Sequence, residues 1–151
     1  MMETADLQSI PLFAGLAGDA LEALAGLASE QRYAIGKTVY AAGEPSENLY
    51  VVVRGSVAVT HQLDGDLVTL ARLSQGYFFG EAGLLKDNQT HSSSARAEVD
   101  GTAILALSRK NFRELTKRNP SAALALVQKV ASVLSERLTE DTTRIAIISA
   151  I

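Results

Sequence analysis

The middle of the chain, from Gln31 to Ser108, is divided by glycines into eight short β-rich segments. One of the separators, Asp64-Gly65, is a two-residue hairpin signal. Short strands at this spacing are typical of a sandwich or a jelly-roll barrel. We therefore expect a mainly β fold with a jelly roll over about residues 31–108. The predicted strands are Gln31–Ile35, Thr38–Ala42, Leu49–Val53, Ser56–His61, Leu67–Leu73, Tyr77–Phe79, Ser93–Val99 and Ala103–Leu107.

Helical patterns flank this β region on both sides. Leucines recur at helix-like intervals before it, and Gly18 or Asp19 is placed to begin a helix that ends near Ser29. Helical spacing resumes at Asn111 and changes direction at Asn119-Pro120, where proline is acceptable as the first residue of a new helix. We expect C-terminal helices over about residues 109–148.

The last of these helices carries the seam of a coiled coil. No glycine or proline interrupts residues 121–151, so one long helix is expected. Packing on the chain's own barrel is one alternative for the seam, but the length favours a homodimer through this helix. The apolar end, residues 145–151, would then be covered by a partner helix or be the remaining part of a segment that has been removed. The seam positions are Val127, Ala131, Leu134, Leu138, Asp141, Ile145 and Ile148.

Composition narrows the class of protein. The 151 residues are 47% hydrophobic, which suits a single soluble domain spanning residues 1–151. With no cysteine, disulfides, thiolate metal sites and cysteine nucleophiles are excluded. No apolar run approaches the roughly 20 residues of a membrane span, and the start is acidic, so we expect a cytoplasmic protein without membrane contact.

The charges and histidines give little support to nucleic-acid binding or to catalysis. The net charge is −3, and the basic cluster between Arg109 and Arg118 is predicted to be a solvated helix face. The two histidines, His61 and His91, are thirty residues apart and lack the spacing of a metal-binding cupin. No nucleophile elbow or P-loop is present. We expect no enzyme and no resident cofactor.

Three spaced motifs carry a family resemblance that covers Leu12 to about Leu138. They are the segment from Leu12 to Leu16, the run from Gly43 to Gly55, and Phe79-Gly80-Glu81. With the order of elements, they make the chain resemble the effector-binding half of the catabolite activator and fumarate-nitrate regulator (CRP/FNR) family. The resemblance implies a cyclic-nucleotide-binding jelly roll with cAMP or cGMP as ligand, acting in signal transduction and transcription regulation. Family transcription factors begin a helix-turn-helix where this chain ends, so we expect no direct nucleic-acid binding, whether the chain is an effector half or a stand-alone module.

The motif Phe79-Gly80-Glu81-Ala82-Gly83-Leu84 resembles the phosphate-binding cassette of that family. In this motif a strand is expected to lead into a short helical turn. Free backbone N–H groups around Gly83 and Leu84 would then favour the binding of an anion. The resemblance implies that Glu81 accepts a hydrogen bond from a ribose hydroxyl. The alternative is a surface carboxylate favoured by the helix dipole.

His91 stands where the resemblance implies a phosphate-binding arginine, nine or ten residues after the glutamate. A neutral imidazole offers one N–H and little charge, so we expect a degenerate cassette whose affinity for a cyclic nucleotide is lowered by about 10- to 150-fold. The next residue, Ser92, matches a small hydroxyl residue that donates to a phosphate oxygen, or it is a turn serine that caps its own backbone.

Two arginines are candidates to replace the missing charge. Arg96 is one candidate, if the loop before it is longer than in the family. In a regular strand, however, Arg96 would lie on the face opposite to His91. Arg137 is the other, because the family's base-contacting hydroxyl pair falls on Arg137 and Leu138, and its charge could act directly or across a dimer. Two rival functions also stay open, a docking module that binds no nucleotide and a sensor of a different anionic small molecule.

Overall fold

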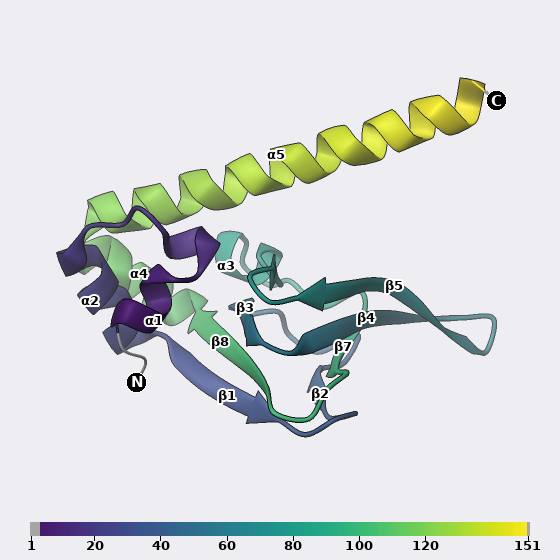
Figure 1. Cartoon of the computed structure of the whole chain (residues 1–151), viewed down its shortest axis with the longest axis horizontal. Coiled ribbons are helices and arrows are strands. Elements are labelled where there is room, and N and C mark those ends of the chain that lie inside the picture. The colour runs from purple at the N-terminus through teal and green to yellow at the C-terminus, as the bar shows by residue number, and fades with distance from the viewer. Residues whose placement is uncertain (1–3, 151) are drawn as a thin grey trace.

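The strands form two antiparallel four-stranded sheets that face each other (Figure 1). The computed structural model describes residues 4–150, with side chains between residues 6 and 140. One sheet has the order β1-β8-β3-β6 and the other the order β2-β7-β4-β5. The strands are β1 (Ser29–Tyr33), β2 (Thr38–Tyr40), β3 (Asn48–Arg54), β4 (Ser56–Leu63), β5 (Asp66–Ser74), β6 (Phe78–Phe79), β7 (Ser94–Ala97) and β8 (Thr102–Ser108).

The predicted jelly roll and all of its strands are confirmed, with shifts at their ends. β1 begins two residues earlier than expected because it pairs with β8 from Ser29 onward. β2 is limited to three residues and has a register shift between Thr38 and Tyr40. Pairing between strands, which the local pattern does not contain, decides these ends.

The helices lie at one end of the sheets and along one side (Figure 1). Ser108 caps α4 through its side chain, which accepts from the Asn111 amide, and Asn119 caps α5 by accepting from the Ala122 amide. Pro120 is the first residue of α5, as predicted. The helices are α1 (Thr4–Gln8), the 3₁₀ turn η1 (Pro11–Phe13), α2 (Gly18–Leu27), α3 (Ala82–Leu85), α4 (Arg109–Arg118) and α5 (Pro120–Ala150).

Strands β3 and β8 are buried on both faces and separate two hydrophobic clusters. Leu49 and Val51 of β3 point to the cluster packed against the helices, whereas Tyr50 and Val52 point into the roll. Phe78 and Phe79 of β6 divide in the same way. Alternate side chains of a strand point to opposite faces, so neighbouring residues of a strand belong to different hydrophobic clusters.

The long helix α5 packs on the helical cluster through one face only. Ala122, Ala123, Leu126 and Val130 are buried there. Leu138 is 68% exposed and Ala131 is exposed, whereas Val127 and Leu134 are half-buried and Leu134 packs on the helical cluster. As far as the described side chains reach, this chain therefore covers the predicted seam only in part. The seam positions Asp141, Ile145 and Ile148 have side chains outside that part. Within the described residues, no helix has the length and apolar character needed to cross a bilayer.

Candidate functional site

The predicted cassette lies where β6 passes into α3, and Gly80 and Glu81 join the two elements. The Gly83 amide donates to the Gly80 carbonyl at 3.1 Å, and the Leu84 amide donates to the Glu81 carbonyl at 3.1 Å. The expectation that these two N–H groups are free to bind an anion is therefore wrong, because the helical turn itself uses them. Ala82, the first residue of α3, is exposed.

Gly83 has a packing role that explains why the position carries no side chain. A Cβ atom there would lie 2.6 Å from both the backbone carbonyl and the hydroxyl oxygen of Ser46. Ser46 is itself buried, and its amide donates to the Gln89 carbonyl at 2.8 Å. The close approach of Gly83 thus holds α3 against the loop before β3. Leu84 is buried beside it in the helical cluster.

His91 lies inside the protein, as predicted, and not in solvent. Its side chain is 9% exposed, and its ring stacks on Tyr40 with 3.5 Å between centroids and 7° between planes. Backbone hydrogen bonds hold the segment in place, because the His91 amide donates to Glu44 at 2.9 Å and the Gly43 amide donates to His91 at 2.8 Å. Burial lowers the pKa of His91, although the nearby Glu44 carboxylate opposes the shift. The imidazole is therefore neutral at pH 7.

Tyr40, Tyr50, Phe79 and His91 form an aromatic group inside the roll, here named the ring cluster. Tyr50 stacks on Phe79 with 5.2 Å between centroids, and Tyr40 lies 5.7 Å from Tyr50 and 6.0 Å from Phe79. Phe79 and His91 were predicted from the sequence as site residues, but the two tyrosines were not. The alternation of aromatic and aliphatic residues in β2 and β3 was the signal that could have found them.

Carboxylates surround the ring cluster. Burial raises the pKa of Tyr40 to about 12, and the charges of Tyr50 and Glu81 add to the shift. Burial also raises the pKa of Tyr50, with further contributions from Glu44 and Glu47. The Glu81 carboxylate is half-exposed and can accept a hydrogen bond from a ligand.

Ser92 and Arg96 do not reach the ring cluster. Ser92 is exposed, and its carbonyl oxygen lies 3.1 Å from His61 Nδ1. Arg96 is exposed between the buried Ala95 and Ala97, so it points away from the interior of the roll. The hypothesis that Arg96 is a displaced cassette arginine is wrong, because β7 is a regular strand at this point.

Arg137 lies on the other side of β6 from the ring cluster. Its Nη2 donates to the Phe78 carbonyl at 3.4 Å, and its guanidinium carbon is 4.5 Å from the centre of the Phe78 ring. It borders a cleft of about 310 Å³ between α5 and the turn that joins β5 to β6. Arg137 therefore does not supply the missing charge to the cassette of its own chain.

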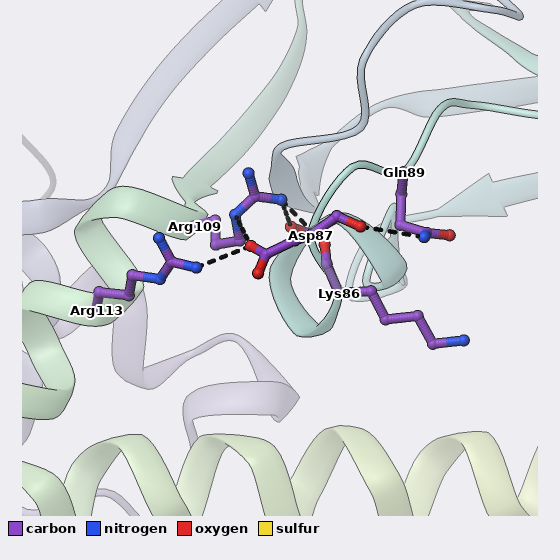
Figure 2. Close-up of polar contacts among 6 residues, drawn as sticks. Lys86, Asp87, Gln89, Arg109 and Arg113 are labelled. Carbon is purple, nitrogen blue, oxygen red and sulfur yellow. Dashed lines mark hydrogen bonds and ion pairs between the residues drawn. The ribbon is translucent and has the colours of Figure 1, made fainter.

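Arg109 connects the cassette to α4 (Figure 2). Its Nη1 donates to the carbonyls of Gly83 at 3.3 Å and Lys86 at 2.9 Å, at the C-terminal end of α3. Its Nε lies 3.3 Å from Asp87, a carboxylate that Arg113 also contacts at 2.8 Å. Cations are favoured at a helix C-terminus, where carbonyls lack partners. The prediction that the basic cluster is only a solvated face is therefore wrong for Arg109.

Replacing Arg109 by glutamine is expected to lower the free energy of unfolding by about 1–3 kcal/mol, because charged hydrogen bonds at a largely buried side chain are lost. Arg113→Gln is the matched control, since that side chain is 61% exposed and its pair with Asp87 should contribute less than about 1 kcal/mol. Urea unfolding of both variants measures the difference. Equal losses in the two proteins would show that Arg109 does not anchor α3.

Known proteins are similar to this chain in sequence and in fold. Residues 30–119 match the cyclic nucleotide-binding domain family. The chain belongs to this family. The resemblance that the three spaced motifs indicated is thereby confirmed.

Relatives of the domain include regulators and one protein named as an enzyme. The cAMP-activated global transcriptional regulator CRP of Pasteurella multocida is 40% identical over 66% of this chain and 48% of that protein. Glutaminase 1 of Bradyrhizobium diazoefficiens is 33% identical over 90% of this chain and 21% of that protein. The catabolite activator protein of Thermus thermophilus has a similar structure, with a TM-score of 0.75 and 34% identity over 92% of this chain and 63% of that one. The domain spans less than two thirds of each of these relatives.

Proposed function

We propose that this domain is a non-catalytic regulatory sensor whose cassette has lost strong affinity for cyclic phosphates. The observation that carries the proposal is the neutral, buried His91, stacked on Tyr40 in the place where the resemblance implies an arginine. A guanidinium binds a phosphate through paired, charged hydrogen bonds, which an imidazole cannot reproduce. Cyclic AMP or cyclic GMP would then bind about 10- to 150-fold more weakly than at a complete cassette.

The surroundings of His91 support this proposal. Arg96 points out of the roll, Arg137 lies on the Phe78 side of β6, and Arg109 is held by Asp87 and the end of α3. None of these three guanidinium groups therefore lies in the ring cluster. The nearby carboxylates of Glu44 and Glu81 oppose an anion further.

The domain would transmit its signal through α5. Leu124 and Leu138 are 58% and 68% exposed and extend the seam along the face that the rest of the chain leaves uncovered. We infer a parallel homodimer through this face, because Leu124, Ala131 and Leu138 are exposed at intervals of seven residues, which favours a coiled coil. A ligand that favours one arrangement of α5 against the roll would shift the population toward that arrangement.

Calorimetric titration with cyclic AMP and cyclic GMP at pH 6 and pH 8 tests the proposal. A cyclic phosphate favours the charged imidazole, so binding takes up a proton and affinity should rise as the pH falls. The gain begins as the pH falls through the pKa of His91 in the complex and levels off below its lowered pKa in the free domain, at no more than about tenfold per pH unit. His91→Gln is the control and should abolish the pH dependence.

Each outcome of the titration has a defined meaning. Tight binding that does not change between pH 6 and pH 8 would contradict a weakened cassette centred on His91. An absence of heat at millimolar ligand would exclude a cyclic-nucleotide sensor and favour the docking module. Weak binding that strengthens at pH 6 and is insensitive to pH in His91→Gln would support the proposal.

A further inference from the structure

Tyr40 occupies one face of the His91 ring. At 3.5 Å between ring centroids the two rings are in van der Waals contact, so no atom fits between them. Phe79 and Tyr50 lie against the other edges of Tyr40. A ligand can therefore stack on this face of the imidazole only if it takes the place of the phenol ring.

The strand that carries Tyr40 is suited to such a displacement. β2 has three residues, pairs with β7 alone, and has a register shift between Thr38 and Tyr40. Short, irregular edge strands have few hydrogen bonds that hold them and belong to the less stable parts of a fold. By contrast, His91 is held by backbone hydrogen bonds with Glu44 and Gly43. Of the two rings, Tyr40 therefore lies on the short edge strand whose pairing is irregular.

The charges around the two rings select against an anion in the same place. Glu44 and Glu81 are close enough to act on His91 and Tyr40. Within residues 6–140, the cation–π contacts are those of Arg137 with Tyr77 and Phe78, outside the ring cluster. A cyclic phosphate would meet carboxylates without a compensating guanidinium, whereas an uncharged ring would meet only aromatic faces and hydrogen-bond acceptors.

We propose that Tyr40 is a specificity-determining residue and that the roll takes a flat, uncharged heteroaromatic ligand, which displaces the phenol ring and stacks on His91. Glu81 accepts a hydrogen bond from a hydroxyl or amine of that ligand. The proposal rests on the sensor function proposed above and names its ligand class. Stacking of one base on an aromatic side chain commonly contributes about tenfold or more in affinity, which offsets the loss of the stack between Tyr40 and His91.

Adenosine and cyclic AMP, titrated at pH 8 and followed by NMR, provide the test. In the wild type, adenosine should bind more tightly than cyclic AMP and shift the ring resonances of His91. Tyr40→Leu removes the competing ring and should raise the affinity for adenosine by about tenfold, with a smaller gain for cyclic AMP. Tyr77→Leu is the matched control, because Tyr77 is 49% exposed and lies against Arg137 outside the ring cluster, and it should leave both affinities unchanged.

A second measurement does not depend on the stability of Tyr40→Leu. In the wild type and in Tyr40→Phe, the His91 Hε1 resonance should show the ring-current shift of a stacked ring, and bound adenosine should alter it. Cyclic AMP binding more tightly than adenosine, no response to adenosine at millimolar concentration, or no ring-current shift on His91 would each overturn the proposal. If His91→Arg gains affinity for cyclic AMP while Tyr40→Leu changes nothing, only the role of Tyr40 fails and the sensor function stands.

Discussion

Replacing His91 by arginine is expected to raise the affinity of the domain for cyclic AMP by about 10- to 150-fold. The guanidinium restores a permanent charge and a fork of donors that matches a phosphate, and charged hydrogen bonds contribute about 1.5–3 kcal/mol. The backbone of His91 is already held by Glu44 and Gly43, so the new side chain starts from the same place. Calorimetric titration of both proteins at pH 7 measures the gain.

Gln128→Arg is the control for added charge, because Gln128 is exposed on α5. It should leave the affinity for cyclic AMP unchanged. Arginine also stacks on aromatic rings, so Tyr40 competes with the phosphate, and the gain should be larger in the double variant His91→Arg/Tyr40→Leu. A folded His91→Arg protein with wild-type affinity would show that position 91 does not face the phosphate.

Replacing Gly55 by alanine is expected to lower the free energy of unfolding by about 2–5 kcal/mol. Gly55 joins β3 to β4 with a φ of +89°, where an L side chain is strained by about 1–2 kcal/mol. A Cβ atom there would also lie 2.5 Å from Thr102 Oγ1 and 2.9 Å from Thr102 Cα. Thr102 is fully buried and donates to the Val99 carbonyl at 2.8 Å, so overpacking adds about 1–3 kcal/mol.

Gly65→Ala separates backbone strain from the clash. Gly65 has a φ of +85°, and a Cβ atom there would meet nothing within 4 Å, so this variant should lose only about 1–2 kcal/mol. Urea unfolding of the two variants gives the comparison. Equal losses would mean that Thr102 and its strand move aside without cost, contrary to the close packing of β3, β4 and β8.

Local patterns in the sequence predicted the backbone of this domain well. Short β-rich segments and the glycines between them indicated every strand, and Asn119-Pro120 located the start of α5. These features depend on the preferences of neighbouring residues, such as the alternation of Leu49, Tyr50, Val51 and Val52 between two faces. They can therefore be recognised without knowledge of the fold.

The surroundings of the cassette were harder to predict. The stack of Tyr40 on His91 joins residues 51 positions apart, and it exists because β2 pairs with β7 and the loops beside these strands are joined by hydrogen bonds. Arg109 contacts the end of α3 from a helix that begins 23 residues after Lys86. Arg109 was predicted to lie in a solvated cluster, because the helical pattern alone does not show which element lies opposite it.

The sequence by itself determined the family, the jelly roll and the long helix, since these follow from local periodicity, turn residues and spaced motifs. Only the tertiary structure decided that the amides of Gly83 and Leu84 are used within α3, that Arg96 and Arg137 lie away from the ring cluster, and that Tyr40 covers His91. The physical reason is that strand pairing and loop closure set the direction of each side chain, and both depend on residues far apart in the chain.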